Sequence, residues 1–134
     1  YADGSLAVAA RPIALTANNQ NRVYGDANPT SGSFTLSSGN LVNGDSLVGT
    51  LAVSSPATVA SDVGNYILTP SGAAFATGAA SDYAITYTDG SLGVTPRPIT
   101  VAAADQSRLY GDANPTSGNF ALTNGTLVNS DIFA

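Results

Sequence analysis

The chain has 134 residues and a formal net charge of −5, from nine aspartates and four arginines. Charged residues make up 10% of the chain, against about 25% in ordinary globular proteins, and Lys, Glu, His, Cys, Met and Trp are absent. Binding to a nucleic-acid backbone needs clustered basic residues, so we expect no nucleic-acid partner. No apolar run approaches the roughly 18 residues that span a bilayer, so we expect no membrane insertion in this segment.

An internal repeat dominates the sequence. Residues 1–48 return as residues 87–134 without a gap, and 28 of the 48 aligned pairs are identical, which gives a period of 86 positions. The longest unaltered block, Tyr24 to Gly32, recurs as Tyr110 to Gly118. A fixed period of this size indicates tandem copies of one structural unit.

Two prolines, Pro96 and Pro98, mark where one unit passes into the next. Their fixed φ and missing N–H suit a stiff, extended junction, and no Gly/Ser linker separates the copies. With the unit boundary placed at these prolines and at the equivalent position, 86 residues earlier, residues 1–10 are predicted to be the last strand of a preceding repeat. Residues 11–96 are then one complete repeat, and residues 97–134 the first half of the following repeat. We expect stiff coupling of such units to give a rod.

Alternating apolar and polar residues predict half-buried strands along the chain. In chain order these strands are expected at residues 5–9, 13–17, 34–36, 50–54, 65–69, 83–87 and 92–94. The stretch Asn18 to Gly32 has the composition of a loop, and Asn43–Gly49 suits one short helical turn. The pair Asp89-Gly90 between two alternating runs predicts a tight hairpin. The fold class is therefore mainly β: a small antiparallel domain of about six strands, β-grasp-like or sandwich-like.

One short motif raises the question of catalysis. Gly44-Asp45-Ser46-Leu47 resembles the opening block of the GDSL hydrolases, whose serine is the nucleophile. Such a serine needs an adjacent base, normally histidine, and the chain has none. The second copy carries Ser130 and Ile132 at two of these four positions, which a repeated catalytic site would not tolerate. We therefore expect a turn followed by a core leucine, and no enzyme.

The most distinctive motif is Tyr-Gly-Asp-Ala-Asn-Pro, which occurs in both copies. In a binding interpretation the tyrosine stacks on a sugar, and the aspartate and asparagine donate or accept hydrogen bonds. In a structural interpretation, which the recurrence at one phase favours, the motif shapes a loop. The candidate ligand or junction contacts are Tyr24, Asp26, Asn28, Tyr110, Asp112, Asn114 and Arg97.

Calcium is the cofactor that these turns allow. It takes six to eight oxygen ligands, and extracellular modules use it at junctions. Asp3, Asp26, Asp45 and Asp89 lie in glycine-rich turns that offer such oxygens. However, no Asp-x-Asp-x-Asp spacing exists, and aspartate in a turn needs no metal.

In combination, these motifs are similar to those of the MBG/YDG-type repeats. The matching residues are the Tyr24–Pro29 block, Leu41–Asp45, Val63–Tyr66 and the closing run from Tyr83 to Ile99. This family occurs in large bacterial surface adhesins and secreted haemagglutinin-like proteins. The resemblance implies a secreted or cell-surface repeat that serves adhesion, biofilm or filament stalks, with no catalytic residues.

Two kinds of partner are expected. Neighbouring repeats of the same chain or identical chains would associate head to tail, with residues 5–9 of one chain completing the strand Ile99–Ala103 of another. Surface glycans are the alternative partner, through exposed Tyr24 or Tyr110. The alternative function is therefore a carbohydrate- or calcium-binding extracellular module.

Overall fold

The computed structural model describes residues 1–133, whose contacts divide into two units, Tyr1–Thr95 and Pro96 onward. Almost all regular structure in both units is β-strand, which confirms the mainly-β prediction. The single helix in the described residues is a 3-10 turn, η1 (Ala80–Asp82). Each unit is described by itself.

The first unit holds more strands than the six or so that the sequence predicts, because several are only two or three residues long. They are β1 (Arg11–Ala17), β2 (Gln20–Val23), β3 (Ser31–Gly32), β4 (Phe34–Ser38), β5 (Ser46–Leu47), β6 (Leu51–Ser54), β7 (Gly64–Ser71), β8 (Phe75–Thr77), β9 (Tyr83–Thr88) and β10 (Gly90–Thr95).

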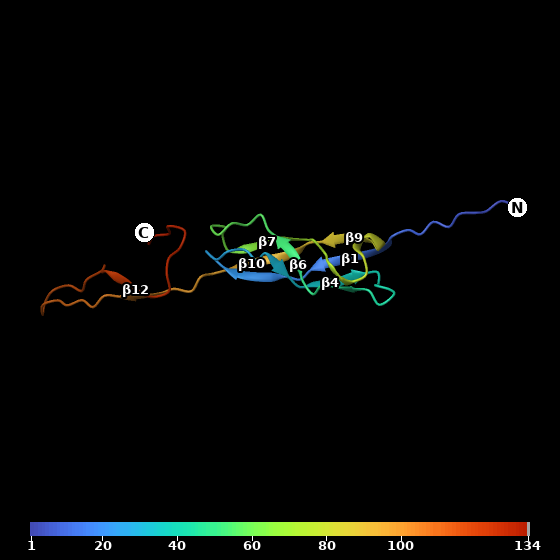
Figure 1. Ribbon diagram of the computed structural model, residues 1–134. Coiled ribbons are helices and arrows are strands. Elements are labelled where there is room, and N and C mark those ends of the chain that lie inside the picture. The colour runs from blue at the N-terminus through green and yellow to red at the C-terminus, as the bar shows by residue number, and fades with distance from the viewer. Residues whose placement is uncertain (134) are drawn as a thin grey trace. The chain divides into compact units, whose positions relative to one another are not determined.

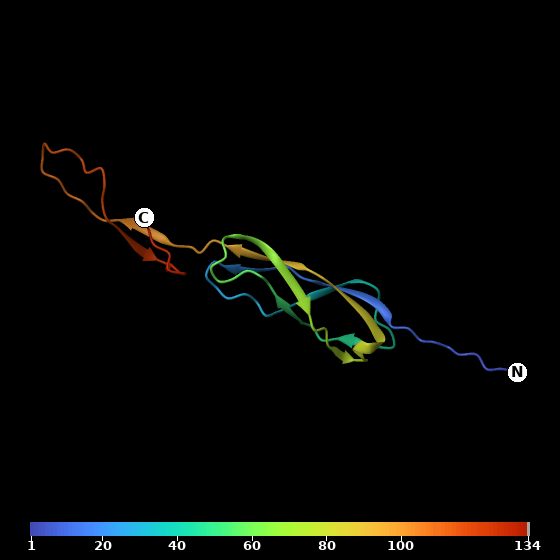
Figure 2. The ribbon, with the colours of Figure 1, turned by 90° about the horizontal axis from the view of Figure 1, so that it is seen from above.

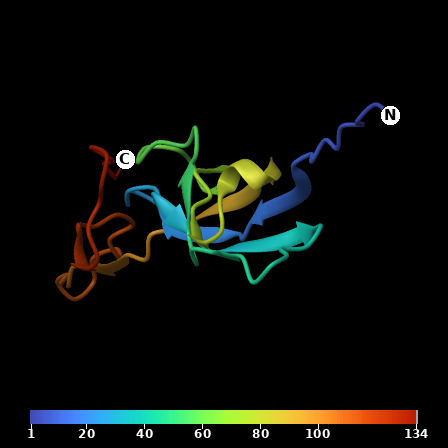
Figure 3. The same cartoon turned by 45° about the vertical axis from the view of Figure 1, so that its right-hand side comes forward.

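Two main sheets and a short two-stranded sheet of β5 and β8 make up this unit (Figure 1). The three-stranded sheet has the order β4-β1-β9, with β1 antiparallel to β4 and parallel to β9. The five-stranded sheet has the order β2-β10-β7-β6-β3, with β10 parallel to β2 and antiparallel to β7. The turn η1, yellow in Figure 3, immediately precedes β9 and so lies near the start of β1.

The core follows the alternation read from the sequence. Inward residues of β1 and β6 are buried while their neighbours in the chain are more exposed, as a strand with one solvated face requires. In β10 the three consecutive residues Leu92, Gly93 and Val94 are all buried. Each leucine so buried contributes about 1.5–3 kcal/mol relative to an exposed one. The buried side chains form two clusters: Ile13, Leu15, Leu51 and Tyr83 in one, and Ala17, Val53, Ala57, Leu68 and Leu92 in the other.

The hairpin predicted at Asp89-Gly90 is wrong. The strands on either side do not pair with each other: β9 pairs with β1 and β10 pairs with β2 and β7. Gly90 does not have a positive φ. Its role is close approach, because a Cβ there would lie 2.5 Å from the carbonyl oxygen of Ala17. The segment therefore runs on from one sheet into the other instead of turning back.

The helical turn predicted at Asn43–Gly49 is also wrong. Asn43 (φ 56°) and Gly44 (φ 77°) form a tight turn that the hydrogen bond from Asp45 N to Val42 O closes at 2.9 Å. Positive φ at both central residues is the type I′ geometry that Asn-Gly favours. The turn leads into β5, where Leu47 packs against the core.

Two further segments differ from the sequence prediction. The stretch expected as a loop, residues 18–32, contains β2 and β3. The sequence pattern missed β2 because its inward residue is Arg22, so no apolar alternation marks the strand. Conversely, residues 5–9 form no strand, and residues 1–10 are exposed throughout. Their repeat equivalent, β10, lies between β2 and β7, whereas no strand of residues 1–133 pairs with residues 5–9.

The second unit rebuilds one strand pair of the first. Its strands are β11 (Thr100–Ala103) and β12 (Phe120–Asn124), which correspond to β1 and β4. Their antiparallel register is that of β1 and β4 shifted by 86 positions, and the irregularity between Ala14 and Leu15 recurs between Thr100 and Val101. The two copies of the sequence thus specify the same local pairing.

Candidate functional site

The Tyr-Gly-Asp loop joins β2 to β3 and is held from within. Gly25 has φ 88°, which favours glycine, and Asp26 N donates to Val23 O at 3.0 Å. Tyr24 N donates to Thr95 O at 2.9 Å, so the loop begins against the last residue of β10. The loop path is therefore set by backbone contacts.

An arginine that the sequence analysis did not single out organises this loop. Arg22 is 7% exposed, and its Nε donates to Asn28 Oδ1 at 2.8 Å while its Nη2 donates to Thr58 O. Asn28 Nδ2 in turn donates to Ala57 O. A buried guanidinium needs such partners, because an unpaired buried charge is costly. The Asn28 amide consequently faces the protein framework.

The second copy keeps the arginine–asparagine contact. Arg108 Nε donates to Asn114 Oδ1 at 2.7 Å, and its Nη1 donates to Asp112 O at 3.1 Å. Gly111 again has a positive φ, 91°. Because this loop forms in a unit whose residues are almost all exposed, its geometry is local. Recurrence of Arg22 and Asn28 at the same phase was the sequence signal for this pair.

The predicted contact residues have different exposures. Tyr24 and Asn28 are half-buried and Asp26 is exposed, whereas Tyr110, Asp112 and Asn114 are all exposed. Arg97, which precedes β11 in the chain, is half-buried. Its repeat equivalent Arg11 donates from Nη1 to Asn40 Oδ1 at 3.2 Å. In each copy the arginine two positions before the tyrosine, Arg22 or Arg108, donates to the loop asparagine.

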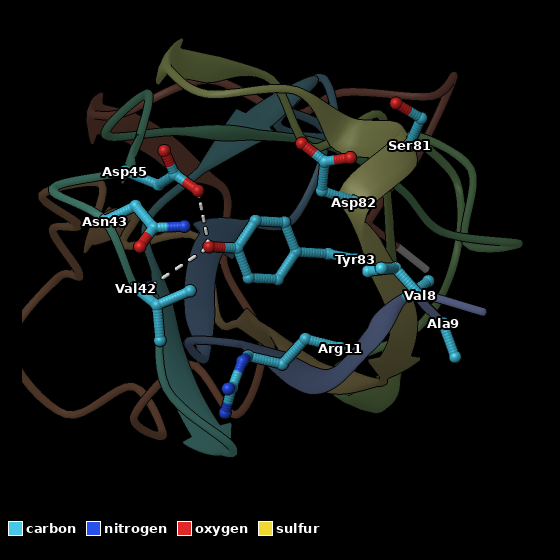
Figure 4. A pocket seen from close by; sticks show the side chains of 10 residues that line it. Val8, Ala9, Arg11, Val42, Asn43, Asp45, Ser81, Asp82 and Tyr83 are labelled. Atoms are coloured by element: carbon cyan, nitrogen blue, oxygen red, sulfur yellow. Dashed lines mark hydrogen bonds between the residues drawn. The ribbon is translucent and has the colours of Figure 1, made fainter. Parts of the chain in front are cut away.

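A cleft of about 320 Å³ lies near the start of β1 (Figure 4). Its lining residues are Val8, Ala9, Ala10, Arg11, Val42, Asn43, Asp45, Ser81, Asp82 and Tyr83. Tyr83 extends from the first position of β9 toward the Asn43-Gly44 turn, and its ring stacks on Phe75 with centroids 5.1 Å apart.

The Tyr83 hydroxyl donates to Asp45 Oδ2 at 2.6 Å and accepts from Val42 N at 3.1 Å. The hydrogen bond to Asp45 raises the pKa of Tyr83 above its ordinary value, outweighing the opposing effect of the Val42 N–H. The neighbouring serine of the hydrolase-like motif, Ser46, shares a hydrogen bond of 2.8 Å with Thr77. Tyr83 and Asp45 thus tie the turn to β9.

A metal site has little support in the described residues. No group of three or more His, Cys, Asp or Glu side chains gathers in residues 1–133. Calcium therefore stays a prediction from the turn composition alone. No helix in this part of the chain is long and apolar enough to cross a membrane.

The fold and the repeated loop define a small β-module, and one strand pair and the loop of this module recur in the second unit. The family model of the MBG domain (YGX type) matches residues 13–93. Because this match covers more than half of the chain, the chain belongs to that family, as the sequence resemblance predicted. No curated protein and no solved structure matches the chain.

Proposed function

We propose that this chain is a non-catalytic structural repeat of an extracellular bacterial adhesin or filament stalk. The observation that carries the proposal is the repeat itself: a second copy, 86 positions on, rebuilds the same strand pair, irregularity and loop. Repeat proteins stack copies of one structural unit, and motifs that recur at the same position of every unit contribute to the fold of that unit. In such proteins the number of units sets the length of the molecule.

The structural role of the repeated Tyr-Gly-Asp loop supports this proposal. Its asparagine amide is bonded to Arg22 and to the Ala57 carbonyl, so the loop stabilises its own unit. The hydrolase-like motif forms a tight turn and a half-buried two-residue strand, and the chain supplies no histidine, cysteine or lysine as a base or nucleophile. These contacts favour a structural module over an enzyme.

Location and partners follow as part of the same proposal. Secretion to the bacterial cell surface suits the family resemblance, and neighbouring repeats are the principal partners. Residues 5–9 are the repeat equivalent of part of β10, which pairs with β2. In an association between separate chains, residues 5–9 of one copy would therefore lie beside residues 106–109 of another, rather than beside Ile99–Ala103.

The test varies the number of units in the surface protein and measures both stalk length and adhesion. We expect length, seen by electron microscopy on intact cells, to grow by a fixed increment for every 86 residues added. We also expect adhesion to depend on copy number and to survive Tyr24→Ala in every copy. Length that is independent of copy number would overturn the proposal.

A glycan array with the same protein separates the alternative. Saturable sugar binding that is lost with Tyr24→Ala and Tyr110→Ala, and kept with Tyr66→Ala, would establish a carbohydrate-binding module instead. Tyr66 is a suitable control because its hydroxyl donates to Asp62 O at 2.9 Å, within another part of the unit.

A further inference from the structure

Two segments that are distant in the sequence lie side by side throughout the first unit. Residues 11–23 and residues 83–95 pair in parallel, as β1 with β9 and then as β2 with β10. Arg11 lies opposite Tyr83, and this offset of 72 positions holds through to Thr95. We call this pair of segments the terminal ribbon. Figure 2 shows it as the blue and yellow-to-orange strands that run together.

The terminal ribbon stays closed where it passes from one sheet to the other. At this point Gly90 lets the backbone approach the Ala17 carbonyl, since a Cβ would lie 2.5 Å from that oxygen. Asn19 bridges the gap between the strand pairs, because its Oδ1 accepts from Ser91 N at 2.9 Å. The ribbon therefore acts as one continuous connection.

The far end of the ribbon is fastened by additional contacts. Thr95 accepts from Tyr24 N at 2.9 Å through its carbonyl, and its Oγ1 donates to Arg22 O at 3.2 Å. Arg22 is buried and is itself held by Asn28. The last residue of the unit is thus tied to the Tyr-Gly-Asp loop at the place where the chain leaves.

The direction of pairing decides how the ribbon responds to tension. Tension along the chain enters at residue 11 and leaves at residue 95. In a parallel pair these are opposite ends, so the pull slides the two segments along each other and loads all the inter-strand hydrogen bonds together. An antiparallel pair that is pulled from adjacent ends opens one hydrogen-bonded step at a time. Sliding therefore has the higher barrier, and forced unfolding is governed by that barrier.

From this geometry we propose that the terminal ribbon is a mechanical clamp that keeps the unit folded under tension along the chain. The inference rests on the proposed stalk function only for the source of the tension. The clamp is a property of residues 11–95 alone. In this clamp the long parallel pairing, Gly90, Asn19 and the contact between the loop and Thr95 all serve to resist tension.

Single-molecule force spectroscopy on the full 134-residue chain tests the clamp, and the absence of cysteine allows handles at chosen sites. Handles at Ala10→Cys and Pro96→Cys pull along the ribbon. Handles at Ser54→Cys and Thr69→Cys, two exposed residues that pair across β6 and β7, open an antiparallel pair from one end.

We expect a peak force along the ribbon at least about threefold that across β6 and β7 at one pulling speed, because forced unfolding follows the barrier in each direction. Thirteen strand residues span about 40 Å, and the unit of 86 residues extends to about 290 Å, so each unfolding event between the handles at residues 10 and 96 should lengthen the chain by roughly 250 Å. Equal peak forces in the two directions would overturn the clamp.

Two adjacent asparagines provide a matched pair of variants. Asn19 joins the two segments of the ribbon, whereas Asn18 donates to Ser33 Oγ at 3.0 Å and accepts from Thr35 Oγ1 at 2.8 Å, outside the ribbon. Asn19→Ala should lower the peak force along the ribbon, and Asn18→Ala should leave it within the experimental spread. An equal loss in both variants would contradict the proposal.

The outcomes of the clamp and stalk experiments are independent. Equal forces in both directions would remove the clamp while stalk length still grew with copy number. Conversely, a strong ribbon in a protein whose length did not follow copy number would keep the clamp and remove the stalk. The comparison of pulling directions needs only cysteine substitutions at exposed positions, so it does not depend on whether Asn19→Ala or Asn18→Ala folds.

Discussion

The two copies of the repeated sequence adopt the same local structure but differ in burial. Ile13 is 3% exposed and its equivalent Ile99 is 38% exposed, and Leu15 at 0% corresponds to Val101 at 42%. In the first unit Leu51 of β6 and Tyr83 of β9 cover this face of β1. Neither has a counterpart within residues 97–133. Strand pairing and loop shape are therefore encoded within about 40 residues, whereas the core needs strands from the later part of the unit.

The largest expected effect comes from removing a side chain that is buried in one copy and exposed in the other. Leu15→Ala should destabilise the first unit by about 2–5 kcal/mol, because it deletes a fully buried side chain and leaves a cavity. Val101→Ala should change the free energy of unfolding by less than about 0.5 kcal/mol. Urea denaturation of both variants measures the difference, and similar losses would mean that the second copy also buries this face.

A glycine pair gives the next largest contrast. Gly90→Ala should cost about 1–3 kcal/mol, because the new Cβ meets the Ala17 carbonyl and forces the terminal ribbon apart. Its repeat equivalent Gly4 has nothing within 4 Å of that position, so Gly4→Ala is the matched control. Thermal unfolding of the two variants tests the prediction. It fails if Gly90→Ala unfolds at the wild-type temperature.

The arginine–asparagine contact should also differ between the copies. Asn28→Ala removes partners of the buried Arg22 and of Ala57 O, which should cost about 1–3 kcal/mol. Asn114→Ala affects the exposed Arg108, so its cost should stay below about 1 kcal/mol. Hydrogen exchange of the amides in residues 22–30 provides the measurement. Unchanged exchange in Asn28→Ala would show that the loop is held by its backbone alone.

The sequence predicted the faces of the strands well, since alternation directly reports which side chains point inward. Leu51 with Val53, and Leu92 with Val94, are buried as expected. It failed where long-range pairing overrode a local signal. Asp89-Gly90 has the composition of a hairpin turn, but its flanking strands pair in parallel with β1 and β2, which lie 72 positions earlier in the chain, and not with each other. There the glycine serves close backbone approach.

At the candidate site, too, the sequence revealed the local features and missed those that depend on long-range contacts. The Tyr-Gly-Asp motif was recognisable because turn residues act locally through their own φ and hydrogen bonds. Arg22 was missed, because a polar residue at the inward position of β2 disguised that strand as loop. Its burial depends on Thr58 and Ala57, about 35 positions later, which periodicity does not reveal.

Tyr83 should produce the smallest effect, a dependence of stability on high pH. Its hydrogen bond to Asp45 raises its pKa in the folded state above the value of 10.0 that an unfolded tyrosine has. The unfolded state therefore loses this proton first as the pH rises. The stabilisation is fully present below pH 10 and is lost as the pH passes through the raised pKa.

Tyrosinate absorbance and urea denaturation, measured across this pH range, give two readouts of the same group. Tyr83→Phe should lack the late-titrating component and should differ from wild type in stability less at high pH than at neutral pH. Asp45→Asn keeps a hydrogen-bond acceptor but removes the charge, so it should bring the Tyr83 pKa back toward its ordinary value. If Asp45→Asn left the titration of Tyr83 unchanged, the carboxylate would not be the cause of the shift. The second copy offers no rival signal, because the equivalent of Tyr83 is not part of residues 97–134.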